Sequence, residues 1–309
     1  MASTMPRSAS AVAFALLVAM SWSAAAQPAT PRDRAAWVAM ARGGFAIPDG
    51  QTAVDLLVAM NPLLASPDPV LRDEVAYGAA ERWILRERRL SPAELRRVLQ
   101  MWTVNLQQGL GDTGTDEVFR RSFSALCLSV VAASDLSAPF LAPAEVKSFF
   151  DRMLDYFERE KDLRGFDLRH GWMHSVAHTS DALKFLARNP KLSVGVDTRL
   201  LAAVRAKVES AGTVFTWGEN ARMAAALDAA VRRDDADPAA LEAWALQWVD
   251  AYAALWKGGP QVDARQFARV ENATQVMRSL YASLSIGGTQ TPAGAAAAKT
   301  VLSALAKMR

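Results

Sequence analysis

All three histidines of this 309-residue chain lie within nine consecutive positions, at His170, His174 and His178, and Asp181 follows shortly after. An imidazole can transfer protons, bind a metal ion or hold a ligand through hydrogen bonds, and a nearby carboxylate supports each of these roles. Positions 174, 178 and 181 are spaced i, i+4 and i+7, so on a helix they share one face. We therefore expect His174, His178 and Asp181 to face one pocket, whereas His170, beside Gly171, belongs to the junction before the helix.

Three kinds of chemistry fit this spacing, and the residues leave all three open. The first is a polar network or ligand-binding groove, in which the buried imidazoles have hydrogen-bond partners. The second is a site for a divalent metal such as zinc, with His174, His178 and either Asp181 or Glu219 as ligands. The third is metal-free acid–base catalysis. Paired histidines are common on helices, and the glutamate of the H-E-x-x-H zinc-protease motif is missing here.

The elements that carry these residues are expected to be helices throughout. Pro92, Pro143 and Pro238 each open a segment whose apolar residues recur every three to four positions, and no segment shows sustained period-two alternation. Each of these segments is followed by a second helical segment with a polar start. One polar residue near each such start gives the series Asp73, Ser122, His174, Asn220 and Asn272, with steps of 49, 52, 46 and 52 residues.

This repeat predicts an all-α fold, specifically a HEAT/armadillo-like right-handed solenoid of about five helix pairs in one domain, residues 27–309. An irregular helical bundle is the alternative. In a solenoid the second helices pack side by side, so their first turns form one polar rim. Ser, Asp and Asn are also common helix caps, which is a simpler explanation for some of these residues. The rim is expected to contain Arg121, Ser122, His174, Glu219, Asn220 and Asn272.

The first 26 residues have the order of a secretory signal peptide. Arg7 precedes an apolar run over residues 11–20, and three alanines end at Ala26, before Gln27. The run is too short to span a membrane well, and no cysteine for a lipoprotein anchor lies at the cleavage point. We expect a mature protein that starts at Gln27, is periplasmic or secreted, and has no membrane span beyond the signal peptide.

Charge and cysteine content exclude several classes of function. The net charge is +3, and removal of the leader with its one charge, Arg7, leaves +2 with both signs mixed along the chain. Such a balance predicts no binding to nucleic acid. The single cysteine, Cys127, lies in an apolar run and is expected in the core, with no intrachain disulfide. Trp217 could form an aromatic wall, but most of the nine tryptophans are expected in the core.

The sequence resembles a bacterial family catalogued as domain of unknown function 2785. The segments that carry the resemblance include SPDPVLRDEVAYGAAERWI from Ser66, DEVFRRSFSALCLS from Asp116, LRGFDLRHGWMHSVAHTSDAL from Leu163, and ENATQVMRSLYASL from Glu271. The resemblance implies a helical, repeat-like fold and supplies no reaction. An export signal and His170 depart from the expected pattern. The residues to which the resemblance points are Arg121, Ser122, Arg164, Gly165, Gly171, Trp172, His174, His178, Asp181, Glu219, Arg222 and Asn272.

Two functions of different class follow from these patterns. The first is a binding module that holds a peptide, protein or small-molecule ligand in a polar groove centred on His174, His178 and Asp181. The second is a hydrolase, in which a metal ion or a histidine base at the same residues activates water and Arg121 clamps an anion. No cofactor is certain, and a divalent metal such as zinc is the candidate.

Overall fold

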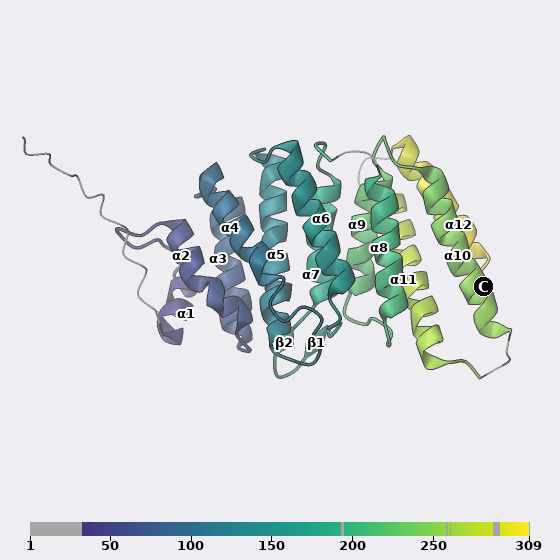
Figure 1. The fold of residues 1–309 in the computed structure, drawn as a ribbon, viewed down its shortest axis with the longest axis horizontal. Coiled ribbons are helices and arrows are strands. Elements are labelled where there is room, and N and C mark those ends of the chain that lie inside the picture. Colours follow the sequence, from purple (N-terminus) through teal and green to yellow (C-terminus); the bar gives the residue numbers. More distant parts are fainter. Residues whose placement is uncertain (1–32, 193–194, 258, 260, 287–290, 309) are drawn as a thin grey trace, which may run out of the picture.

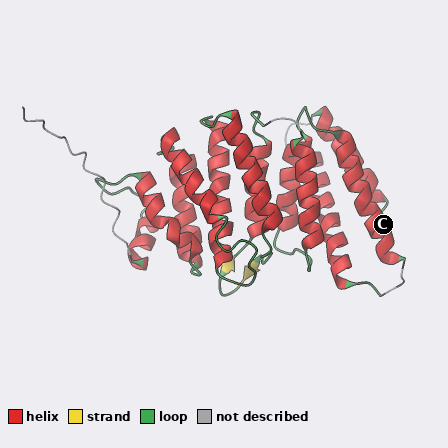
Figure 2. Ribbon diagram, in the orientation of Figure 1, coloured by secondary structure: helices red, strands yellow, loops and turns green. Residues whose placement is uncertain are grey.

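Almost all of the described chain is helical. The computed structural model describes residues 33–192, 195–257, 259, 261–286 and 291–308, so the expected signal peptide lies outside the described residues. Within these ranges the only strands are β1 (Phe166–Asp167) and β2 (Gly171–Trp172), which form one short antiparallel hairpin (Figure 2). The expectation of an all-α protein is therefore confirmed, with this hairpin as the exception.

The helices form two layers along the molecule (Figure 1). The chain begins with α1 (Arg34–Arg42), α2 (Ala53–Met60) and a 3-10 turn (Asn61–Ala65). The first-helix layer contains α4 (Pro92–Asn105), α6 (Pro143–Arg159), α8 (Val196–Ser210) and α10 (Pro238–Trp256). The last helix, α12 (Pro292–Ala306), packs against α10 and α11. The second-helix layer contains α3 (Gly78–Ala80) with its flanking π-helical turns (Val70–Tyr77 and Glu81–Arg86), α5 (Glu117–Ser137), α7 (Ser175–Ala187), α9 (Glu219–Val231) and α11 (Ala264–Ile286).

Two helices of the first-helix layer, α4 and α10, begin where proline and a capping residue stand together. Pro92 is the first residue of α4, and the Ser91 and Glu94 side chains each accept a hydrogen bond from the other residue's backbone amide. Pro238 opens α10 in the same way, with the Asp237 carboxylate accepting from the amide of the second helical residue. Such caps satisfy amides that have no partner inside the helix, and proline there loses nothing. The predicted starts at Pro92, Pro143 and Pro238 are therefore confirmed.

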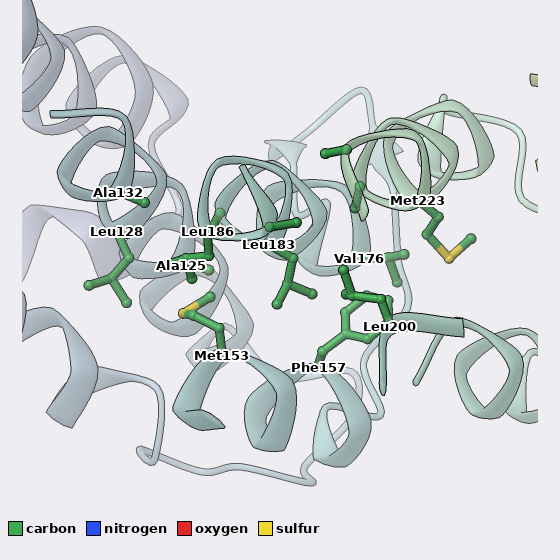
Figure 3. Close-up of a cluster of buried hydrophobic side chains, with 14 of the residues drawn as sticks. Ala125, Leu128, Ala132, Met153, Phe157, Val176, Leu183, Leu186, Leu200 and Met223 are labelled. Atoms are coloured by element: carbon green, nitrogen blue, oxygen red, sulfur yellow. The ribbon is translucent and has the colours of Figure 1, made fainter. Parts of the chain in front are cut away.

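The core lies between the two layers. Met153 and Phe157 of α6 point toward Val176, Leu183 and Leu186 of α7 (Figure 3), and all five side chains are buried. Burying a side chain of this size contributes about 1.5–3 kcal/mol. The same cluster of buried apolar residues continues along the whole described chain. The apolar stripe with period 3.6 thus joins the layers as its spacing predicts.

The second helices pack in succession, as expected: α5 against α7, α7 against α9, and α9 against α11. Two of them begin elsewhere than expected. The helix expected to carry His174 begins only at Ser175, because residues 166–172 form the hairpin, and α11 begins at Ala264, so Asn272 lies well inside it and not near its start. No helix in the described part of the chain is long and apolar enough to cross a membrane.

Candidate functional site

The hairpin fixes where the histidine segment enters α7. Phe166 pairs with Trp172, and the ladder continues as the amides of Met173 and His174 donate to the carbonyls of Gly165 and Arg164, at 2.8 and 3.0 Å. Extended backbone therefore lasts up to His174, and only then does the helix begin. The cap is unusual, because His174 adopts a left-handed backbone conformation (φ 53°) that residues other than glycine rarely take.

This geometry changes the predicted role of His174. It is the residue before the helix and not a member of its first turn, although its carbonyl accepts the amide of His178 at 3.0 Å. Its Nε2 donates to the Trp217 carbonyl at 2.9 Å and lies 3.8 Å from the Glu219 carboxylate. Burial lowers the pKa of His174, and the charge of Glu219 opposes that shift. The Trp172 ring stacks on the imidazole, with ring centroids 4.6 Å apart.

His178 has its tautomer set by a serine. The Ser122 hydroxyl has one hydrogen, and it donates this hydrogen to the Met173 carbonyl in a short hydrogen bond. His178 Nδ1 lies 2.8 Å from the same hydroxyl oxygen, so Nδ1 must carry the proton and donate it. The Nε2 atom is then an unprotonated acceptor. Burial, followed by the neighbouring His174 and Arg222, lowers the pKa of His178 well below its ordinary value and keeps the ring neutral.

The acceptor Nε2 of His178 has no partner within the described residues. This nitrogen is not fully buried either, so it is accessible from a surface. His178 is only 7 % exposed, and the surface it reaches is a pocket of about 370 Å³ in the second-helix layer. We call this cavity the α5–α7–α9 pocket. It is lined by Tyr77, Leu126, Ser129, His178, Asp181, Lys184, Phe185 and Arg222.

Three charged groups stand at one side of the α5–α7–α9 pocket. Asp181 forms a short ion pair with Arg222 Nη1, and Lys184 Nζ is 3.3 Å from the same carboxylate. Two positive charges thus face one negative charge. The Arg222 side chain is half exposed, whereas Asp181 is buried. Arg222 and Asp181 were both expected at the site, but Tyr77, Lys184 and Phe185 were not, because nothing in their local sequence marks them.

His174 was expected to share this pocket with His178 and Asp181 but does not line it, and neither does His170. The Nδ1 atom of His170 is 3.0 Å from the Asp167 carboxylate within the hairpin, and its ring packs against Phe119. Hydrogen bonds from His170 hold the pKa of Asp167 at about 2. Its carbonyl accepts from the buried guanidinium of Arg72, which also binds the Trp172 carbonyl. His170 and Arg72 therefore hold the hairpin in place.

Arg121 does not open on the expected polar rim. It is fully buried and donates to the carbonyls of Gln108 and Gly109, at 2.9 and 2.8 Å, and it pairs with the buried carboxylate of Glu160. The correction has a physical reason. A buried guanidinium needs all its donors satisfied, and the loop after α4 supplies carbonyls that would otherwise have no partner. Arg121 therefore closes a loop, and its donors face away from the histidines.

Asn220 and Asn272 support the segment that carries Trp217. The Asn272 amide group bridges this segment, accepting from the Phe215 amide at 2.7 Å and donating to the Thr213 carbonyl at 3.0 Å. Asn220 donates to the Phe215 carbonyl at 3.5 Å. Asn272 lies well inside α11 and Asn220 is the second residue of α9, so neither caps a helix with its side chain. Both residues position the site indirectly.

An aromatic cluster covers the entrance to α7. Phe166 lies 4.8 Å from Trp172 and 5.2 Å from Trp217, measured between ring centroids. Trp217 is 47 % exposed, whereas most of the described tryptophans are buried, as expected. Gly165 makes this packing possible, since a Cβ there would lie 2.3 Å from the Trp217 ring and 2.6 Å from Glu219. Gly218, in a left-handed conformation (φ 92°), turns the chain between Trp217 and α9.

The described side chains of this region are not arranged as the ligands of a metal ion. Among the described residues, no group of three or more histidine, cysteine or acidic side chains is placed to hold a metal ion. His178 Nδ1 is engaged with Ser122, and Asp181 is neutralised by Arg222 and Lys184. No cofactor is indicated by this arrangement.

These features define an all-helical protein with a small polar pocket built on consecutive second helices. The chain belongs to a family described as protein of unknown function (DUF2785), whose model matches residues 106–282. That range includes the hairpin, all three histidines, Asp181 and Arg222. The expected family membership is therefore confirmed. No curated protein matches the chain, and no solved structure matches it.

Proposed function

We propose that this protein is an exported binding module: a HEAT/armadillo-like right-handed solenoid that holds a ligand in the α5–α7–α9 pocket. The regular succession of helix pairs supports the solenoid, because each pair buries its apolar face against the next. Such arrays commonly use the exposed faces of their repeated helices to bind partners. The ligand is a small molecule or a short segment of a peptide or protein, and nucleic acid is not among the partners.

Export is part of the proposal and rests on the sequence. The basic residue, apolar run and alanine-rich end of residues 1–26 support cleavage before Gln27 and a periplasmic or secreted location. The chain has one cysteine, Cys127, so it forms no intrachain disulfide in an oxidising compartment. This cysteine is buried. Burial also raises the pKa of the Cys127 thiol above its ordinary range, which protects it from oxidation.

The observation that carries the binding proposal is the free acceptor of His178. His178 lines the pocket and its Nδ1 is satisfied by Ser122, so we infer that Nε2, for which the described residues supply no partner, opens into the pocket. Water can donate to an acceptor that opens into a pocket, and a ligand that displaces this water keeps the interaction only if it supplies a donor of its own. A ligand that donates to Nε2 completes this hydrogen bond.

The hydrolase alternative has weaker support. A general base works best when its pKa lies near the working pH, and the pKa of His178 is pushed well below that of an ordinary histidine. Arg121, which would bind the anion in the hydrolase hypothesis, is buried against Glu160 and the loop after α4. Binding therefore accounts for the pocket better than catalysis does.

Thermal-shift screening tests the binding proposal. Purified mature protein is screened against a panel of carboxylates, phosphates, amines, sugars and short peptides, in parallel with Arg222→Gln. We expect at least one compound to raise the melting temperature of the wild type and to lose that effect in the variant. Arg199→Gln is the matched control, because Arg199 of α8 is about as exposed as Arg222 and forms an ion pair with Asp151 of α6. If every stabilising compound acted equally on Arg222→Gln, the pocket would not be the binding site.

A further inference from the structure

The α5–α7–α9 pocket offers three different kinds of wall, and each constrains what fits. The positive wall consists of Arg222 and Lys184, the acceptor is His178 Nε2, and the apolar wall consists of Leu126 and Phe185. Its volume of about 370 Å³ lies at the lower end of the range for small-molecule sites, which is about 300–1,000 Å³. The pocket therefore suits one or two amino-acid-sized units.

The positive wall keeps unused donors. Arg222 donates only from Nη1 to Asp181, and its other N–H groups have no partner in the part of the chain that the structure describes. Lys184 contacts the same carboxylate at 3.3 Å, so the two cations exceed the charge of Asp181 by one. A planar guanidinium with free, parallel N–H groups matches a carboxylate, which it can bind through two hydrogen bonds. An amine would be repelled by the same two cations.

Tyr77 adds a neutral donor to this side of the pocket. Burial, more than the nearby charges, raises the pKa of Tyr77 to about 12, so its hydroxyl stays protonated at physiological pH. Tyr77 reaches the pocket from the helix of residues 70–77, next to Arg222 of α9 and Asp181 of α7. A ligand carboxylate beside Arg222 would therefore meet a hydroxyl donor as well.

His178 selects what lies next to the carboxylate. Its Nε2 accepts and cannot donate, because Ser122 holds the ring proton on Nδ1 and the low pKa prevents a second protonation. The ligand must place an N–H or O–H donor at this point. A fully ionised phosphate has only acceptor oxygens to offer there. A carboxylate with an adjacent amide N–H satisfies both Arg222 and His178.

We propose that the pocket recognises an α-amido carboxylate with an apolar side chain, the chemistry shared by the C-terminal residue of a peptide and by a free N-acylated amino acid. This proposal rests on the proposed function and names its ligand class. The carboxylate binds Arg222 and Tyr77, the amide N–H donates to His178 Nε2, and the side chain packs on Leu126 and Phe185.

Fluorescence anisotropy with matched probes tests the proposal. The probe is an N-terminally fluorescein-labelled Gly-Gly-Ala-Leu peptide with a free carboxyl terminus, and its C-terminal amide is the matched comparison. The free acid is expected to bind at least tenfold more tightly than the amide. Arg222→Gln is expected to weaken the free acid at least tenfold and Tyr77→Phe severalfold, whereas Arg199→Gln leaves it unchanged.

Competition by unlabelled N-acetyl-leucine distinguishes the two possible ligands, a free N-acylated amino acid and the C-terminal residue of a peptide. Displacement of the probe supports recognition of the acylated amino acid itself, and binding of the peptide without such displacement supports recognition of a chain terminus. Equal binding of acid and amide, an unaffected Arg222→Gln variant, or no binding of either probe at millimolar concentration would overturn the proposal. If a compound without a carboxylate stabilised the wild type but not Arg222→Gln in the thermal-shift screen, the ligand class would be wrong and the binding module would stand.

Discussion

Replacing Ser122 with alanine is expected to destabilise the protein far more than the loss of one hydroxyl suggests. The Ser122 hydroxyl donates to the Met173 carbonyl and accepts from His178 Nδ1, so it joins α5 to the start of α7. Ser122, Met173 and His178 are all buried. Ser122→Ala leaves a carbonyl and an N–H group without partners at a place that water does not reach.

The size of the expected loss in stability follows from the two groups that lose their partner, the Met173 carbonyl and the His178 Nδ1–H group. An unsatisfied buried donor or acceptor costs about 1–3 kcal/mol, which gives about 2–6 kcal/mol for the two. The imidazole can recover part of this by moving its proton from Nδ1 to Nε2, which faces the pocket and its water. We therefore expect Ser122→Ala to lower the free energy of unfolding by about 2–4 kcal/mol.

Urea denaturation followed by circular dichroism measures this loss, with Ser180→Ala as the control. Ser180 is equally buried, but its hydroxyl only donates to the Val176 carbonyl within the same helix. Such a bond contributes little to helix stability, so the control should lie within about 0.5 kcal/mol of the wild type. If both variants lost the same amount, the hydroxyl would not be bridging the two helices, and the tautomer assigned to His178 would have no basis.

Burial lowers the pKa of His174 and His178, so below about pH 6.5 the unfolded chain takes up protons that the folded chain does not. The free energy of unfolding should therefore decrease as the pH is lowered below this point, by up to about 1.4 kcal/mol per pH unit for each histidine. Urea titrations of His178→Gln at several pH values should show a smaller slope than the wild type. Gly165→Ala should lose about 1–3 kcal/mol, because the new methyl group displaces Trp217; a melting temperature equal to that of the wild type would contradict this packing. N-terminal sequencing of periplasmic material should begin at Gln27, and an intact leader would refute export.

The helical part of the fold could be predicted because it rests on local signals. Proline with a capping residue marks a helix start, and a period of 3.6 marks the face that is buried. Both hold at Pro92 and Pro238, and the recurring polar residue places α5, α7 and α9 side by side. The same periodicity on α7 explains why the sequence already groups His178 with Asp181.

The rest of the site depends on contacts between distant segments, which no local pattern reveals. Strands of two residues are too short to show alternation, so the hairpin at Phe166 and the left-handed His174 were missed. Arginine in a charged run is typical of a surface, yet Arg72 and Arg121 are fully buried because separate loops supply carbonyls to them. Tyr77 joins the pocket from a helix about 100 residues before His178.

The central claim is that His178 presents an unprotonated Nε2 to the α5–α7–α9 pocket. Long-range ¹H–¹⁵N NMR of the imidazole rings at neutral pH tests it most directly, and with three histidines in the chain the signals can be assigned from His170→Ala and His178→Gln. We expect a protonated Nδ1 and an unprotonated Nε2 for His178, and the Nε2 resonance should shift when an amide-bearing carboxylate binds. A proton on Nε2, or a charged imidazolium, would show that His178 does not offer an acceptor to a ligand.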